Sequence, residues 1–445
     1  MVSPSDLRAD VVIDWNRVAS DVFRDNTSLQ NPGMASRSMA MMNLAIYDAI
    51  ASTTQGADMF YDYGSGHSSP GLSSSGAAAV SQAAYTVLSG IYGDQQSTLD
   101  AELTAQLSLV PDGMAKTDGV ALGTMIGQSI LTRRAGDGYD SLSQYMPTSA
   151  PGHWQPDPLN PGQQAWGPAW GEVLPFALQS NRQFVAPPMP DLGSQEYADA
   201  YNEVKELGAL NSTARTDEQT DIGHFWAYDR VGMGTPHRLF NQALRTIAVQ
   251  EGNTVEENAS LFAKASVAVA DAGIIAWNSK FEYDFWRPVT GIRQGDSDGN
   301  DMTAADVDWT PLGAPGGSSV PDFTPPFPTY VSGHATFGGA LFGALAEFYG
   351  EDNISFTLES EELTGPEATR TFSSFSEAMA ENGRSRVYLG IHWNFDDTVG
   401  QELGLDVAGY VFSRPFIAPV PEPGSLGTTC CAFVCWAAAR RRRRA

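Results

Sequence analysis

The sequence predicts an all-α fold in which two helical bundles form one compact unit. Three observations support this prediction. Apolar residues recur at helical period over most of the chain, and the alternating runs typical of strands are nearly absent. The helical segments fall into two groups, separated by a stretch rich in Pro and Trp. With 445 residues, the chain is long enough to bury a large core.

The first bundle is expected within residues 1–136. Helical period begins at Val11, and further helices are expected over residues 34–52, 76–92, 95–109 and 115–135. Met is frequent in the second of these helices, where it is expected to fill irregular core space rather than to form a cofactor site. We predict no chemistry in this bundle.

Residues 137–192, here named the strap, show little periodicity and are rich in Pro and Trp. Loops of this length in compact domains are usually functional or wrap the surface. We therefore expect an ordered segment near the mouth of a site in the second bundle.

The second bundle is predicted over residues 193–419, with a separate tail at 420–445. Its helices are expected at residues 194–207, 216–226, 235–250, 255–290, from 335 onward, 372–389 and 396–412. The acidic run DSDGND before the fifth helix lacks the Gly and Glu that an EF-hand calcium loop needs at its sixth and twelfth positions. That loop is expected to be a solvated surface feature.

The composition argues against several classes of partner and site. Asp and Glu number 52 against 26 Lys and Arg, which argues against nucleic acid as a partner. The three Cys all lie in the tail, so the body offers no disulfide framework, thiolate metal site or Cys nucleophile. Four of the six His are expected to be structural or exposed: His67, His153, His224 and His237.

Three blocks of the second bundle carry the groups that bind an oxyanion. Ser332, Gly333 and His334 stand where a Pro-rich approach enters a helix, whose free N–H groups and dipole attract an anion. Upstream, Lys280 and Arg287 are seven residues apart, which would place them on one face of a single helix.

The downstream block, SRVYLGIHWNFDD, supplies Arg386, His392 and Asp396. The i, i+4 spacing of His392 and Asp396 would let the carboxylate orient the imidazole ring on a helix. Arg386 and His392 are six residues apart and would not share a helix face, so a break is expected near Gly390. The three blocks together suit a tetrahedral or trigonal-bipyramidal oxyanion.

The order and spacing of these blocks resemble the signature shared by type 2 phosphatidic acid phosphatases and vanadium-dependent haloperoxidases. The one departure is Val331, where the signature usually has Pro. Residues 225–242 also resemble fungal-type vanadium chloroperoxidases, which implies that Asp229 pairs with Arg386. Trp277 and Phe327 match the aromatic residues that lie beside vanadate in that family.

As a vanadate-dependent haloperoxidase, the chain would oxidise halide with hydrogen peroxide to hypohalous acid, which would reach a small organic acceptor. The resemblance implies that His392 ligates vanadium and that five residues surround the vanadate oxygens: Lys280, Arg287, Ser332, Gly333 and Arg386. His334 would exchange protons with hydrogen peroxide. The vanadium would act as a Lewis acid.

The aromatic residues are expected to make the halide pocket dry. Trp277 lies one helical turn before Lys280, and Phe327 would form the opposite wall. The pocket would hold Lys280 against a peroxide oxygen and leave His334 without a polar neighbour. This arrangement predicts ready oxidation of bromide and measurable oxidation of chloride.

Two alternatives stay open. As a soluble acid phosphatase, the chain would use His392 as nucleophile and His334 as the acid that protonates the leaving group. As a non-catalytic envelope protein, it would only bind an oxyanion. The haloperoxidase interpretation is preferred because the resemblance extends over residues 11–412, and because no long apolar run of the kind found in membrane phosphatases occurs before residue 425. The sequence does not determine the preferred halide, the organic acceptor or the oligomeric state.

The tail resembles the PEP-CTERM sorting signal of bacterial envelope proteins, since VPEPG at 420–424 precedes an apolar run and an Arg cluster. This resemblance implies export to the bacterial envelope or the medium, with transient membrane contact through the tail. Such proteins also carry an N-terminal signal peptide. None is visible here, so export would require a start farther upstream.

Overall fold

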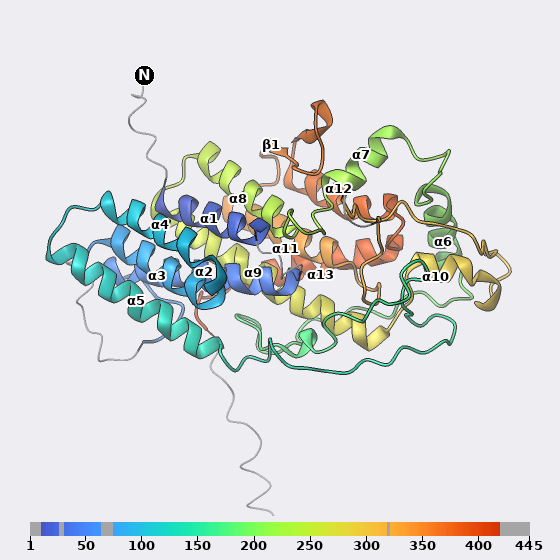
Figure 1. The fold of residues 1–445 in the computed structure, drawn as a ribbon, viewed down its shortest axis with the longest axis horizontal. Helices are drawn as coiled ribbons and strands as arrows, with labels where there is room; N and C mark the ends of the chain where they lie inside the picture. The colour runs from blue at the N-terminus through green and yellow to red at the C-terminus, as the bar shows by residue number, and fades with distance from the viewer. Residues whose placement is uncertain (1–9, 26–30, 64–73, 318–320, 419–445) are drawn as a thin grey trace, which may run out of the picture.

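The computed structural model describes residues 10–25, 31–63, 74–317 and 321–418, and this part of the chain is mostly helical (Figure 1). The first group of helices comprises α1 (Val11–Asp25), α2 (Pro32–Thr53), α3 (Gly76–Ile91), α4 (Gln96–Ser108) and α5 (Met114–Arg134). The second comprises α6 (Gln195–Leu207), α7 (Asp217–Phe225), α8 (His237–Glu251), α9 (Val255–Tyr283), α10 (Pro288–Arg293), α11 (Gly333–Tyr349), α12 (Phe375–Tyr388) and α13 (Asn394–Phe412). The predicted all-α fold is confirmed. His67 and the predicted tail lie outside the described residues.

Short 3₁₀ helices connect some of these elements: η3 (Gly93–Gln95), η4 (Trp170–Glu172), η5 (Gly295–Ser297) and η6 (Pro366–Ala368). Helices α9 and α11 begin where a side chain caps the free N–H groups. Thr254 and Glu257 form a capping box ahead of α9. Ser332 caps α11 by accepting a hydrogen bond from the backbone N–H of Ala335. This cap fixes where the positive end of α11 lies.

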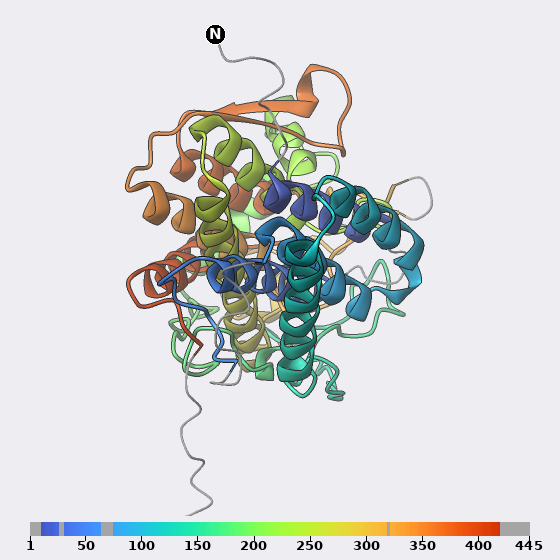
Figure 2. The same ribbon diagram turned by 90° about the vertical axis from the view of Figure 1, so that its left-hand side faces the viewer.

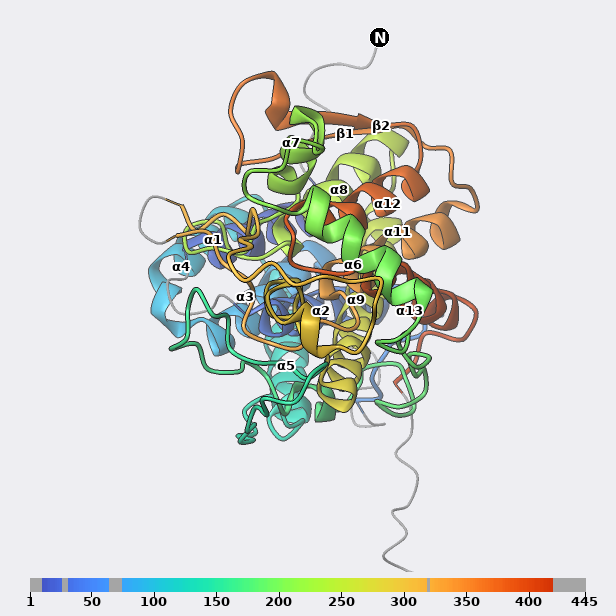
Figure 3. The same cartoon turned by 90° about the vertical axis from the view of Figure 1, so that its right-hand side faces the viewer.

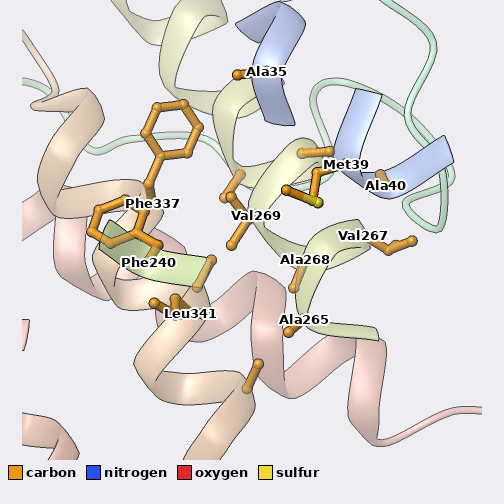
Figure 4. Packing of buried hydrophobic residues seen from close by; sticks show 14 of the residues in the cluster. Ala35, Met39, Ala40, Phe240, Ala265, Val267, Ala268, Val269, Phe337 and Leu341 are labelled. Atoms are coloured by element: carbon orange, nitrogen blue, oxygen red, sulfur yellow. The ribbon is translucent and has the colours of Figure 1, made fainter. Parts of the chain in front are cut away.

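Helix α9 runs through the middle of the molecule and packs against α2 of the first group and against α11 and α13 of the second (Figures 1 and 2). Figure 4 shows part of this shared core, which includes Met39, Ala40, Val267, Ala268, Val269, Phe337 and Leu341. Among the described residues, α9 alone is long and apolar enough to cross a membrane, but 89% of its most apolar stretch is buried inside the protein. Burial of α9 by both groups makes them one compact unit.

Helices α11 and α13 approach each other closely because glycine stands at their contact. A Cβ atom at Gly404 would lie 2.3 Å from the carbonyl oxygen of Thr336, so no side chain fits there. The close approach brings the start of α11 next to the first turn of α13. Accordingly, the backbone N–H of Ser332 donates to the carbonyl of Asp396 at 3.0 Å.

The end of α9 differs from the prediction. The helix stops at Tyr283 instead of continuing to residue 290. Asp284 takes a left-handed conformation with φ of 54°, and Arg287 is extended, with ψ of 156°, because it precedes Pro288. The prediction that Lys280 and Arg287 share one helix face is therefore wrong, and Arg287 reaches the site from the start of α10.

A small antiparallel hairpin interrupts the helical pattern. Strands β1 (Phe356–Glu359) and β2 (Thr369–Phe372) pair with Phe356 opposite Phe372, and the hairpin lies over α8 and α12 (Figure 3). The helix predicted from residue 372 begins only at Phe375. Strands of four residues are too short to give a clear alternating signal.

The strap runs along one side of the second group of helices (Figure 1). Hydrogen bonds hold its backbone against the helices, and two sets of them lie near the site. The carboxylate of Asp271 on α9 accepts hydrogen bonds from three successive backbone N–H groups: Phe176, Ala177 and Leu178. The N–H of Trp166 donates to the carbonyl of Pro326 at 2.8 Å. The strap is therefore fixed beside α9 and beside the segment that leads into α11.

Candidate active site

A small cavity opens at the N-terminal end of α11. Seven of the eleven residues predicted for the site line it: Asp229, Trp277, Phe327, Gly333, His334, Arg386 and His392. The other four are buried behind this lining: Lys280, Arg287, Ser332 and Asp396. The fold thus brings together residues from segments separated by up to 167 positions, as far apart in sequence as Asp229 and Asp396.

His392 is held at both ring nitrogens. Its Nδ1 atom lies 2.9 Å from Asp396 Oδ2 and 3.1 Å from the hydroxyl of Thr329, and its Nε2 atom lies 2.9 Å from Arg287 Nη1. Because Arg287 can only donate, Nε2 is the acceptor and the proton is on Nδ1. Burial lowers the pKa of His392 well below its usual value, and Arg287 adds to this effect. The ring is therefore neutral, and the lone pair of Nε2 accepts the hydrogen bond from Arg287.

Asp396 sets the orientation of that ring. Its Oδ2 atom also accepts from the hydroxyl of Thr329 and, at 3.0 Å, from the N–H of Trp393. Burial raises the pKa of Asp396 to about 7, whereas Thr329 and Lys280 act in the opposite direction. Three donors that converge on one oxygen match a carboxylate acceptor. The predicted contact between His392 and Asp396 is present, but His392 lies before α13 and not on it.

Lys280 is fully buried, and its ammonium group is directed at the backbone. Nζ donates to three carbonyls, those of Pro328 at 3.1 Å, Thr329 at 2.9 Å and Val331 at 2.5 Å. Burial lowers the pKa of Lys280 well below its usual value, and the nearby Arg287 also lowers it. The expectation that Lys280 points at a peroxide oxygen is corrected, because its three hydrogens already have acceptors.

Two buried arginines keep donors without a partner. Arg287 donates to the carbonyls of Phe327 and Ile391, which leaves Nη2 without a partner in the structure. Arg386 donates to Asp229 Oδ2 at 2.6 Å, whereas its Nε and Nη1 have none. Buried N–H groups of a guanidinium are costly to leave unpaired. These three nitrogens therefore point to an anionic ligand.

His334 has polar neighbours, contrary to the expectation. Its Nε2 atom lies 3.1 Å from the carbonyl of Trp226, 3.2 Å from that of Ala227 and 4.0 Å from the carboxylate of Asp229. Burial is the main cause that lowers the pKa of His334 to about 4, and Arg386 contributes, while Asp229 and the two carbonyls act in the opposite direction. His334 is thus a neutral base at neutral pH.

The aromatic residues form one continuous wall and not two opposite ones. The ring centroids of Trp277 and Phe327 are 5.1 Å apart, and Trp166 of the strap packs edge-on against Trp277 at 5.2 Å. The Phe327 ring also faces the ammonium of Lys280 at 5.0 Å and the guanidinium of Arg287 at 4.9 Å. This wall separates the buried cations from water.

Comparisons with known proteins decide the family. The family described as "VCPO second helical-bundle domain" matches residues 260–416, which contain all three blocks. The vanadium chloroperoxidase of Curvularia inaequalis is 32% identical to this chain, over 90% of this chain and 81% of that protein.

The chain belongs to the vanadium chloroperoxidase family.

Solved structures share its fold. A bacterial vanadium-dependent iodoperoxidase has a TM-score of 0.73 at 24% identity, with 91% of this chain and 95% of that chain covered. The holo-type structure of a bacterial vanadium-dependent chloroperoxidase has a TM-score of 0.67 at 17% identity, with 87% of this chain and 93% of that chain covered. The arrangement of helices is therefore that of the family.

The residues present fit the vanadate for which the family is named. The unpaired donors of Arg287 and Arg386 suit the oxygens of an oxyanion, and His392 Nε2 would ligate the metal in place of its hydrogen bond from Arg287. Gly333 adds the first N–H of α11. A Cβ atom at this position would lie 3.2 Å from the ring of Trp277, so a larger residue would crowd the anion site.

Sequence reasoning missed several members of the site. Thr329 binds both His392 and Asp396, and its place three residues before Ser332 is the only sequence signal for it. Four further residues that line the cavity are apolar and carry no motif of their own: Pro32, Pro236, Pro325 and Phe337. The predicted break near Gly390 is confirmed, because α12 ends at Tyr388 and Gly390 has φ of 72°.

Proposed function

We infer that the chain is a vanadate-dependent haloperoxidase, which oxidises halide with hydrogen peroxide to hypohalous acid. One observation carries this inference. Two buried arginines keep three nitrogens without a hydrogen-bond partner, and one of these arginines bonds Nε2 of the neutral imidazole of His392. The same donors, with a proton acceptor beside them, match the chemistry of the family.

In this function, His392 would ligate vanadium through Nε2. Arg287, Arg386, Ser332 and the N–H of Gly333 would hold the oxygens. Lys280 would contribute its charge and fix the turn at residues 328–331, on whose carbonyls its hydrogens are used. Vanadate, when bound, supplies a Lewis acid that activates hydrogen peroxide toward attack by halide.

His334 would take a proton from hydrogen peroxide and return one later. Its Nε2 faces two carbonyl oxygens, which only accept, so the proton lies on Nε2 and the lone pair on Nδ1. Nδ1 is therefore the atom that accepts the proton. Asp229 keeps Arg386 in place and stabilises the charge that forms on the ring. The hypohalous acid would then leave and halogenate a small organic acceptor.

The test of this function is a halogenation assay on the vanadate-free protein, with and without added orthovanadate. We expect bromide oxidation that depends on both vanadate and hydrogen peroxide. A phosphatase assay on the same samples tests the alternative, in which the chain is an acid phosphatase. Hydrolysis of a phosphate monoester by the vanadate-free protein, with no halogenation after loading, would assign the site to phosphatase chemistry.

Phe327→His is expected to change halide choice. The imidazole would admit water beside Lys280 and Arg287 and remove the ring face that both cations contact. A cation–π contact in a desolvated site is worth up to about 2 kcal/mol, so chloride turnover should fall about tenfold relative to bromide turnover. Steady-state rates with each halide measure this ratio.

The matched control is Phe348→His, which places the same change on the far end of α11. It should leave the chloride-to-bromide ratio as it is in wild type. An unchanged ratio in Phe327→His, or wild type without chloride turnover at mildly acidic pH, would contradict the proposed role of the aromatic wall.

We also propose that the protein is exported by a bacterial cell and sorted through residues 420–445. This proposal rests on the order of the VPEPG motif, the apolar run and the Arg cluster. A chain that ends at residue 420 should keep full bromide oxidation and an unchanged melting temperature, because every residue proposed for the site lies before it. Loss of folding on truncation would show instead that the tail belongs to the folded body.

A further inference from the structure

His334 takes its orientation from the turn at residues 225–230. Trp226 and Ala227 supply the two carbonyls at its Nε2, so the turn decides which ring nitrogen carries the proton. Asp229 of the same turn lies 4.0 Å from Nε2 and bonds Arg386. The position of this turn therefore sets both the tautomer of His334 and the charge beside it.

The centre of this turn is strained. Tyr228 has φ of 47°, a left-handed conformation that a bulky side chain rarely adopts and that persists only where the surroundings hold it. Its side chain is buried, and its hydroxyl accepts a hydrogen bond from the backbone N–H of Glu361 at 2.7 Å. The strained residue is thus tied to a segment far away in the sequence.

Two more bonds from the same segment hold the ends of the turn. The hydroxyl of Ser360 donates to the carbonyl of Phe225 at 2.8 Å. Arg230 Nε donates to the carboxylate of Glu362 at 2.9 Å. Three consecutive residues, 360–362, therefore fix the start, the middle and the end of the turn.

This segment is itself anchored. It follows β1 directly, and the last residue of that strand, Glu359, exchanges two hydrogen bonds with Gln242 of α8. Its N–H donates to Gln242 Oε1 at 2.8 Å, and its carbonyl accepts from Gln242 Nε2 at 3.0 Å. The hairpin therefore connects the turn to a long helix of the body.

We propose that residues 360–362 form a clamp that holds the turn so that His334 keeps its proton on Nε2 and presents Nδ1 to the cavity. Tyr228 is the positioning residue through which the clamp acts. The hairpin, which has no part in oxyanion binding, thereby gains a role in catalysis. This proposal rests on the proposed function, in which His334 exchanges protons with hydrogen peroxide.

The test removes two bonds of the clamp in Tyr228→Phe, Ser360→Ala and the double variant. Imidazole ¹⁵N spectra of the vanadate-free protein at neutral pH report the tautomer of His334. The signals of His334 are identified as those that are missing in His334→Gln. We expect wild type to show the Nε2–H tautomer alone and the double variant to show both tautomers. Tyr228→Phe keeps the ring and its packing, so this variant is expected to fold.

The loaded enzyme gives the second readout. In the double variant, kcat for bromide should fall about tenfold with KM for bromide unchanged, as for loss of an interaction that acts in the transition state. In a plot of kcat against pH, activity falls on the acidic side, and this acid limb should move to lower pH. The two carbonyls and Asp229 raise the pKa of His334, while burial and Arg386 lower it. A turn released from the clamp holds the carbonyls and Asp229 less closely to the ring, so the pKa should fall.

Tyr92→Phe is the matched control, since it deletes a buried tyrosine hydroxyl that bonds Ser38 at 2.9 Å in the first group of helices. It should cost a similar amount of stability and change neither the tautomer nor the pH profile. A single Nε2–H tautomer in the double variant, or an acid limb that stays where it is in wild type, would overturn the clamp.

The two readouts separate this proposal from the proposed function. The spectra need neither vanadate nor halide. Absence of halide oxidation in loaded wild type would refute the function, while mixed tautomers in the double variant would still support the clamp.

Discussion

His392→Ala should abolish retention of vanadate. His392 Nε2 lies 2.9 Å from Nη1 of Arg287, the guanidinium whose Nη2 has no partner, and His392 lines the same cavity as Arg386. Loss of residues that merely orient a metal ligand typically costs 10–100-fold in affinity, so loss of the ligand itself should cost at least about 100-fold. Isothermal titration of vanadate-free protein with orthovanadate measures the effect.

Asp396→Asn should have a smaller effect than His392→Ala, because it keeps His392 and removes only the carboxylate that accepts the Nδ1 proton. It should weaken vanadate binding by about tenfold to 100-fold. Added imidazole should restore part of the binding of His392→Ala by occupying the space of the lost ring. Vanadate affinity of His392→Ala within a few-fold of wild type would refute the assigned role.

His334→Ala should keep vanadate but lose turnover. The imidazole lines the cavity and is proposed to be the proton acceptor, and general acid–base catalysis contributes roughly 10²–10⁴-fold to a rate. We therefore expect kcat for bromide to fall by that factor, with vanadate affinity within a few-fold of wild type. Equal loss of binding in His334→Ala and His392→Ala would show that the two histidines do not divide the roles in this way.

The pH dependence of wild type provides an independent check on His334. Burial lowers its pKa to about 4, so the ring is a neutral base above that pH and is protonated below it. Turnover should fall as the pH drops through this pKa, and a bound oxyanion should move the limb to higher pH because negative charge favours the imidazolium. The kcat profile measures the limb. If the residual activity of His334→Gln still falls at the same acidic pH, the fall is caused by a group other than His334.

Local sequence signals were sufficient for most of the helical framework. The period of apolar residues located the helices of the first group within a few residues, since that period depends only on which faces are buried. Gly390 marked the break before His392 because glycine alone adopts a positive φ at little cost. The order and spacing of the three blocks identified the family before any contact was known.

Only the tertiary structure decided what each of those side chains does. Sequence spacing placed Lys280 near the site, but packing gave all three of its hydrogens to backbone carbonyls and left the free donors to Arg287 and Arg386. Thr329 carried only its place three residues before Ser332, and Tyr228 carried no signal. Their roles arise from hydrogen bonds to residues 63 and 133 positions away, respectively. Helix period is a local property of the chain, whereas the partner of a buried donor is set by which distant segments the core brings together.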